Sequence, residues 1–165
     1  GSAMSRGIRC GPLVFRDPLL LCGVLYVLLW RDASGFLRLG LLAAFLHEWG
    51  HIAAYGAMFH RFPVIEVTMT GFCMRTRGQA MTPRQTALLA AAGPAVNLFL
   101  ACLWMGKLDR RATIRAGAFL AANLLTAAFN LLPIPPLDGA QLVECAFLCR
   151  KQENSDCNSG PNRVQ

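Results

Sequence analysis

The chain has 165 residues, which is enough for one domain and leaves no room for a second of ordinary size. Hydrophobic residues make up 55% of it and charged residues only 15%, whereas a soluble domain typically carries about 25% charged residues. The net charge of +7 comes without a clustered basic helix or interleaved aromatic residues, so we expect no nucleic-acid partner.

Three long intervals of the chain are almost free of charge. Between Arg38 and Arg61, histidines aside, Glu48 is the only acidic or basic residue, and no charge interrupts residues 85–106 or 116–137. Each interval holds 22 residues, and a helix needs about 20 to cross the hydrocarbon core of a bilayer. We therefore predict an integral membrane protein in contact with lipid. The Lys and Arg bias of its connections favours a cytoplasmic N-terminus.

The first half of the chain is expected to hold two helices and a hairpin. Residues 19–30 are apolar, but the run is shorter than a full membrane span, so we expect a short first span or a partly inserted helix. After Ser34-Gly35, a second helix runs over about 36–59. Apolar and polar residues then alternate over 65–70, which predicts a strand, and after a turn at Gly71 the chain pairs back as a β-hairpin.

Two or three further helices follow the hairpin. Thr82-Pro83 marks the start of a third helix, which continues to about Met105. A fourth helix covers about 113–132 and ends at Pro133-Ile134-Pro135-Pro136, because three prolines in four residues cannot continue a regular helix. A short last helix is expected over about 139–149.

The predicted fold is mainly α: a polytopic membrane bundle of three to four spanning helices, with a small β-hairpin between the second and third. We expect one integral-membrane domain over residues 4–150, a tag remnant at 1–3, and a disordered C-terminal tail at 151–165 that is rich in Asn, Ser, Gly and Pro. Seven cysteines are present without a CxxC pair. Several of them are predicted to be small core residues, namely Cys22, Cys102 and Cys145.

A metal-binding pattern lies in the middle of the second predicted helix. His47-Glu48-Trp49-Gly50-His51 matches H-E-x-x-H, in which histidines four residues apart project from one helix face and can bind one metal ion. Glu48 can take the proton of a metal-bound water. An ionisable group at the centre of a membrane helix costs several kcal/mol unless it has a partner or water, so the pattern indicates a functional site.

A catalytic zinc site needs a third protein ligand and one open position. Asp138 directly follows the proline break, and broken helices at membrane depth normally line a cavity. Glu144 is the rival ligand, and an ordinary helix N-cap is the other role open to Asp138.

The two motifs together resemble those of the site-2 protease family of intramembrane zinc metalloproteases. His47-Glu48-x-x-His51 matches its zinc motif, and the segment from Asn130 to Gly139, with Pro133, Pro136 and Asp138 inside it, matches a later helix. The resemblance covers about 36–145 and is closest to compact bacterial members, including those that process a sporulation sigma-factor precursor. Neither a PDZ nor a CBS domain is visible in this sequence.

The resemblance implies a role for each of these residues. His47, His51 and Asp138 would bind zinc, Glu48 would be the general base, and Asn130 would contact the substrate carbonyl. The segment Gly93-Pro94-x-x-Asn97 also looks like the family's third-helix pattern, which makes Asn97 a candidate substrate-binding residue, with a helix–helix hydrogen bond as the alternative.

The predicted hairpin provides further candidate substrate-binding residues. A helical substrate must unwind before it is cleaved, and its freed backbone groups then need partners, which a strand can supply by pairing with the extended segment. Val67, Met69 and Gly71 are the residues concerned, and a plain surface hairpin is the alternative.

We thus expect an intramembrane zinc endopeptidase, in a bacterial cell membrane, that cleaves transmembrane protein substrates; the sequence names no regulatory partner. Two alternatives remain. One is a non-catalytic membrane metal-binding or scaffold protein. Glu48 disfavours this alternative, because a non-ligand carboxylate beside the metal is needed for hydrolysis and not for metal storage. The other is an HExxH protease of another family that uses a glutamate as its third ligand.

Overall fold

The structure is a computed structural model, and it describes residues 8–10, 13–15, 18–68, 71–75, 80–108 and 113–158. Five helices and four strands lie in these ranges. The helices are α1 (Pro18–Arg31), α2 (Phe36–Phe59), α3 (Pro83–Leu108), α4 (Ile114–Asn130) and α5 (Asp138–Asn158). The strands are β1 (Ile8–Cys10), β2 (Leu13–Phe15), β3 (Val64–Thr68) and β4 (Gly71–Arg75). The fold is mainly helical, as predicted.

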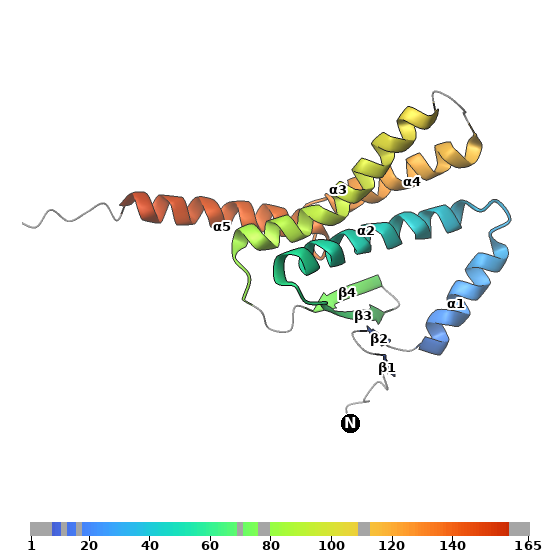
Figure 1. Ribbon diagram of the computed structural model, residues 1–165, viewed down its shortest axis with the longest axis horizontal. Coiled ribbons are helices and arrows are strands. Elements are labelled where there is room, and N and C mark those ends of the chain that lie inside the picture. The colour runs from blue at the N-terminus through green and yellow to red at the C-terminus, as the bar shows by residue number, and fades with distance from the viewer. Residues whose placement is uncertain are drawn as a thin grey trace, which may run out of the picture.

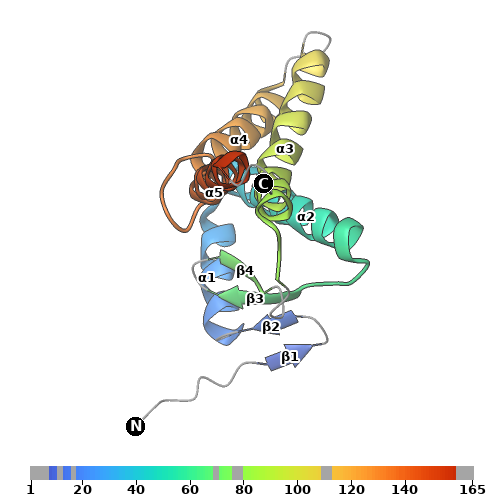
Figure 2. The same cartoon turned by 90° about the vertical axis from the view of Figure 1, so that its left-hand side faces the viewer.

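Helix α3 lies at the centre of the bundle (Figure 1). It packs against α2, α4 and α5, while α2 also contacts α4. Helix α1 contacts α2, and the distal part of α5 extends away from the other helices (Figures 1 and 2). The three helices with the longest charge-free intervals therefore form one packed unit.

The sheet lies on the side of α2 that faces away from α4 (Figure 1). Its strand order is β1-β2-β3-β4, with β2 and β3 parallel and the other two pairs antiparallel. Strands β3 and β4 are the expected hairpin between α2 and α3. Strands β1 and β2 were not predicted, because three-residue strands are too short for an alternating pattern and pair only once β3 is in place.

Local side-chain caps explain where two of the helices begin. Before α3, the Thr82 hydroxyl accepts from the Gln85 amide at 3.3 Å, and the Gln85 side chain accepts from the Thr82 amide at 3.0 Å, which is a capping box. Before α4, the Thr113 hydroxyl accepts from the Ala116 amide at 3.2 Å. Helix α3 continues past Pro94 as one element.

The C-terminal boundary differs from the prediction. Helix α5 begins at Asp138 and continues to Asn158, so residues 151–158 are helical and not part of a disordered tail. The stretch after Cys149 contains Arg, Lys, Gln and Glu, which favour helix even where they bury nothing. Residues 159–165 lie outside the described residues.

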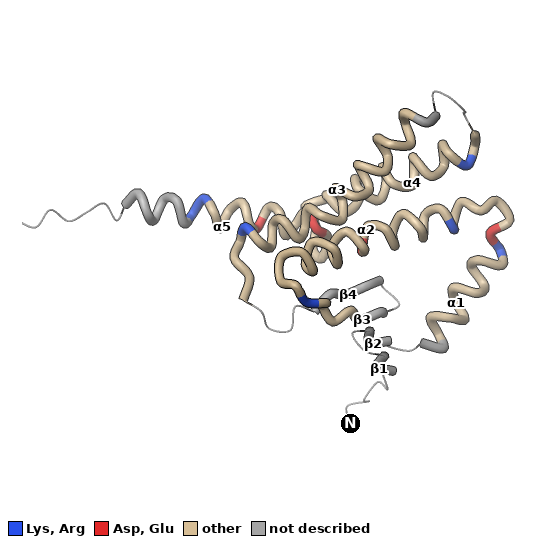
Figure 3. The backbone as a smooth tube through the Cα atoms, in the orientation of Figure 1, with Lys and Arg blue, Asp and Glu red and all other residues tan. Residues whose placement is uncertain are grey.

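The described core holds several buried polar residues among small and apolar ones, while many large apolar side chains lie on the surface, which is unusual for a soluble domain. Asn97 and Asn123 are fully buried, and small residues such as Ala43, Ala101 and Ala127 line the helix contacts. Large side chains stay exposed on every helix, among them Trp30, Phe45, Trp49, Leu88, Phe99, Leu125 and Phe147. In α1 to α4 the charged positions lie near helix ends, apart from Glu48 inside α2, whereas α5 carries charges along its length (Figure 3).

Helix α3 alone among the described helices is both long and apolar enough to cross a membrane by length and composition, over Pro83–Gly106. Only 33% of its apolar window is buried inside the molecule, so most of that surface is free to face lipid.

The three cysteines predicted to be core residues are placed differently. Cys22 and Cys102 are exposed on their helices, whereas Cys145 is buried as predicted. The prediction that Cys22 and Cys102 are core residues is wrong: it rested on the usual burial of free cysteine, but on these helices apolar side chains are also exposed at the surface.

Candidate metal centre

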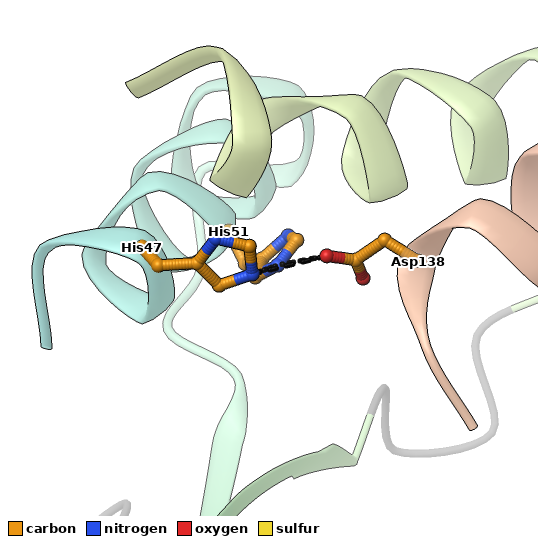
Figure 4. A group of neighbouring side chains, drawn as sticks. All are labelled: His47, His51 and Asp138. Carbon is orange, nitrogen blue, oxygen red and sulfur yellow. Dashed lines mark hydrogen bonds and ion pairs between the residues drawn. The ribbon is translucent and has the colours of Figure 1, made fainter. Parts of the chain in front are cut away.

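Three potential metal ligands converge at the centre of the bundle (Figure 4). His47 and His51 project from one face of α2, and Asp138 reaches them from the first residue of α5. The Nε2 atoms of the two histidines lie 3.1 Å apart. The Oδ2 atom of Asp138 lies 3.0 Å from His47 Nε2 and 3.3 Å from His51 Nε2. Each of the three residues is at most 9% exposed.

The histidines are oriented by groups on α3. His51 donates from Nδ1 to the backbone carbonyl of Leu89 at 2.8 Å. A carbonyl can only accept, so the proton of neutral His51 is on Nδ1 and its Nε2 lone pair points to the cluster. His47 Nδ1 lies 2.8 Å from Oδ1 of Asn97, which is fully buried.

Asp138 is placed by the turns that follow α4. The Leu137 amide donates to the Ile134 carbonyl, and the Ala140 amide donates to the Leu137 carbonyl. A Cβ on Gly139 would collide with the backbone of Leu131. Glycine therefore lets the start of α5 pack against the end of α4, which brings the carboxylate to the histidines.

Gly93 leaves the space in which the ligand atoms meet. A Cβ at this position would collide with His51 Nε2 and would lie 2.7 Å from His47 Nε2. The backbone of α3 thus forms one wall of the centre, and any larger residue would fill it. From the sequence, Gly93 was noted only as part of the Gly93-Pro94-x-x-Asn97 pattern.

The donor set fits a zinc ion. Zinc bonds to nitrogen and oxygen are about 2.0–2.1 Å long, and a tetrahedron of that size places neighbouring ligand atoms about 3.3 Å apart. The three ligand–ligand distances here are 3.0, 3.1 and 3.3 Å. Two imidazole nitrogens and one carboxylate oxygen also match the donors that zinc prefers, and leave a fourth position for water or substrate.

Glu48 lies beside this cluster without being one of its three ligands. It is half-buried and interacts electrostatically with His47, His51 and Asp138. Glu144, the rival third ligand, is exposed on α5. The geometry thus brings together Asp138, and not Glu144, with the two histidines.

The two asparagines that were predicted to touch substrate are placed differently. Asn130, the last residue of α4, donates from Nδ2 to the Thr126 carbonyl of its own helix at 2.9 Å and is partly buried. Asn97 donates from Nδ2 to the Ala43 carbonyl and to Asn123 Oδ1, while its Oδ1 faces His47. Asn97 therefore makes the helix–helix hydrogen bonds that were the alternative to substrate binding.

The hairpin candidates are only partly described. Val67 lies in β3, opposite Phe15 of β2 on one side and Phe72 of β4 on the other. Gly71 begins β4, and Met69 lies outside the described residues. Strand β3 is thus paired on both sides, and β4 is the edge nearer the helices (Figures 1 and 2).

Three contributors to the centre were missed from the sequence. The Leu89 and Ala43 carbonyls orient side chains of the centre, and backbone atoms leave no signal in the residue types. The Gly93 contact could have been anticipated, because a glycine in a helix often marks a close approach.

Comparison with known proteins supports this picture. Two curated relatives, both named putative zinc metalloprotease Rip3 and from two strains of Mycobacterium tuberculosis, are 31% identical over 140 residues. The match covers 80% of this chain and 35% of each relative. A putative zinc metalloprotease Rip2 of Mycolicibacterium smegmatis is 46% identical over 72 residues, covering 39% of this chain and 27% of that protein. The chain thus spans about a third of the length of the curated relatives it matches.

The fold also has a solved counterpart. The site-2 protease from Methanocaldococcus jannaschii superposes with a TM-score of 0.59 at 18% identity, over 88% of this chain and 73% of that one. No protein-family model matches the chain. The predicted resemblance to the site-2 protease family is confirmed by the fold and by relatives named zinc metalloproteases.

Proposed function

We propose that this chain, which has the site-2 protease fold, is a zinc-dependent endopeptidase that cleaves peptide bonds in or near transmembrane segments of membrane proteins. One observation carries the proposal. Two imidazoles and one carboxylate converge at zinc-binding distances, and a further carboxylate, that of Glu48, lies beside them.

The site would act inside a bilayer. Its ligands are buried in a bundle whose outer surface carries large apolar side chains, and the charges of α1 to α4, apart from Glu48, lie near helix ends (Figure 3). A soluble domain does not expose apolar surface on this scale without a partner to cover it. We therefore propose that α2, α3 and α4 span the membrane as a polytopic bundle within one domain over residues 4–150. The short α1 spans or inserts partly, and the N-terminus is cytoplasmic.

His47, His51 and Asp138 would hold the zinc ion through Nε2, Nε2 and a carboxylate oxygen. Zinc, when bound, acts as a Lewis acid towards the scissile carbonyl and lowers the pKa of water to about 7. Glu48 accepts the proton of the attacking water and passes it to the leaving amine, which must depart protonated. Buried helix contacts exclude bulk water from the ligands.

Asn130 is proposed to stabilise the oxyanion, as the resemblance implies. An amide nitrogen carries two N–H groups, and one of them makes the bond to Thr126. Asn97 is better placed to orient His47 than to touch substrate, because it is fully buried.

The test uses purified protein in detergent with a pool of synthetic transmembrane peptides, and mass spectrometry of the products. We expect cleavage by the wild-type protein and none by Glu48→Gln, with zinc bound by both. A protein that binds zinc but cleaves no peptide in the pool, nor any membrane protein captured by Glu48→Gln, would instead be a non-catalytic metal-binding protein.

A further inference from the structure

Two asparagines without exposed surface lie behind His47. Asn97 on α3 and Asn123 on α4 are both 0% exposed, and they are among the largest side chains that the described core buries completely. Inside a bilayer such polar groups persist only where they have hydrogen-bond partners. Their partners therefore indicate what they do.

The direction of each hydrogen bond is settled by two backbone carbonyls, which can only accept. Asn123 donates from Nδ2 to the Phe119 carbonyl at 2.8 Å, so its Oδ1 is the atom that faces Asn97. Asn97 donates from Nδ2 to the Ala43 carbonyl at 3.0 Å and to Asn123 Oδ1 at 2.9 Å. These two bonds use both N–H groups of Asn97, and its Oδ1 is left to face His47 Nδ1 at 2.8 Å.

The oxygen of Asn97 decides where neutral His47 carries its proton. An oxygen at 2.8 Å requires an N–H on Nδ1, so Nε2 keeps its lone pair and points to His51 and Asp138. A turned Asn97 amide would present an N–H to Nδ1 instead. The proton would then move to Nε2, and a protonated Nε2 cannot bind a metal.

We propose that Asn97 and Asn123 form a positioning relay that holds His47 in its metal-binding tautomer and so sets the zinc affinity of the centre. The relay rests on the proposed metal site but adds a role for two residues that touch neither metal nor substrate. His51 needs no such relay, because a backbone carbonyl, that of Leu89, orients it. The relay also joins α2, α3 and α4, so the ligand is fixed only when all three helices have assembled.

Zinc affinity, measured in detergent by competition with a chelator, tests the relay. In Asn97→Leu the acceptor is lost at nearly constant volume, and we expect zinc binding about 10- to 100-fold weaker than in wild type. Asn97→Asp restores an acceptor for the Nδ1 proton and should bind zinc more tightly than Asn97→Leu. Asn123→Leu removes the acceptor that helps to hold the Asn97 amide, so a smaller loss is expected.

Thr126→Val is the matched control. Thr126 lies one turn after Asn123 on α4, is partly buried, and donates its hydroxyl proton to the Ala122 carbonyl outside the relay. Its replacement removes a hydrogen bond from the same helix, and zinc affinity should stay at the wild-type value.

A second readout needs no variant. The chain has three histidines, so labelling with ¹⁵N-histidine gives few signals. In the zinc-loaded protein the Nδ1 protons of His47 and His51 should both exchange slowly with water, because each is buried and hydrogen-bonded. Asn97→Leu should lose the protection of the His47 proton and keep that of His51, which serves as an internal reference.

The outcomes separate the relay from the proposed function. A wild-type protein without zinc would overturn both. Wild-type protein that binds zinc, with Asn97→Leu binding it equally tightly, would overturn the relay and leave the protease proposal standing. Should Asn97→Leu not fold, Asn123→Leu and the wild-type spectrum decide: an unprotected His47 Nδ1 proton in zinc-loaded wild type rules the relay out.

Discussion

Gly93 lies directly against His51, so closely that a Cβ at Gly93 would overlap the Nε2 atom that is turned to the metal centre. The contact means that the α3 backbone, and not a side chain, closes this side of the site. A single methyl group, added at Gly93, therefore tests whether this wall limits the space of the centre.

Gly93→Ala should weaken zinc binding by about 5- to 150-fold. Forcing a methyl group into a packed site costs about 1–3 kcal/mol, and about 1.4 kcal/mol corresponds to a factor of ten in affinity. Gly106→Ala is the control, because a Cβ at Gly106, on the same helix, would meet nothing within 4 Å. Equal zinc affinities of the two variants would show that the α3 wall does not limit the site.

The third ligand can be identified by elemental analysis. The wild-type protein should carry about one zinc ion per chain, and His47→Ala, His51→Ala and Asp138→Ala should each deplete it. Glu144→Ala should keep its zinc, since Glu144 is exposed on α5. Full zinc in Asp138→Ala together with none in Glu144→Ala would contradict the assignment.

Glu48→Gln should retain zinc and fold but lose peptide-bond cleavage by about 10²- to 10⁴-fold, because an amide cannot accept a proton from water. Glu48 interacts electrostatically with the three ligand residues but is not one of them. Metal content is therefore the control, and it should equal that of the wild-type protein. Cleavage by this variant at close to the wild-type rate would exclude Glu48 as the general base.

Local patterns account for much of what the sequence predicted. The bounds of α2 and the shared face of His47 and His51 depend only on residues near one another in the chain, so both could be predicted. Asp138 was marked as a candidate by the proline break next to it. A helix–helix hydrogen bond of Asn97 was one of its two expected roles, but the partner Asn123 was not foreseen, because nothing in the sequence relates positions 97 and 123 before α3 and α4 pack.

The parts that sequence reasoning missed depend on non-local pairing. Strand β1 pairs with β2, and β2 pairs with β3, which follows it by about fifty residues in the chain. Because β2 pairs with β3, β3 is an inner strand of the sheet and not an edge. An extended substrate therefore cannot pair with β3, where Val67 lies.

Acid should weaken the junction between α1 and α2. Partial burial of the Asp32 carboxyl raises its pKa, but hydrogen bonds from the Arg38 amide and the Ser34 hydroxyl outweigh burial and leave the pKa below its usual value. A carboxyl whose pKa is lowered by folding stabilises the folded protein at pH values above its pKa in the unfolded chain, about 3.9. This stabilisation is lost as the pH falls through the pKa of the folded state.

The measurement compares thermal unfolding of wild-type protein and Asp32→Asn in detergent between about pH 3 and pH 6. Wild type should be the more stable at the upper end, and the difference should shrink towards the lower end. Because other carboxylates titrate in both proteins, only the difference between them reports on Asp32. A difference that stays constant over this range would contradict the role of the Asp32 charge.

The edge strand β4 gives the last prediction. Strand β3 is paired on both sides, so an unwound substrate can add only to β4 or to β1, and β4 is the edge nearer the helices (Figures 1 and 2). In an antiparallel pair, successive residues alternate between bonding the partner and facing away from it. In a proline scan of 71–75 the effect should therefore alternate from residue to residue. Where the lost N–H faced outwards, the variant should keep its zinc and its fold but cleave poorly. Where the lost N–H bonded β3, the sheet should be disturbed. Val67→Pro, inside β3, should disturb the sheet. Unchanged cleavage of a transmembrane peptide throughout the scan would exclude β4 as the substrate-binding strand.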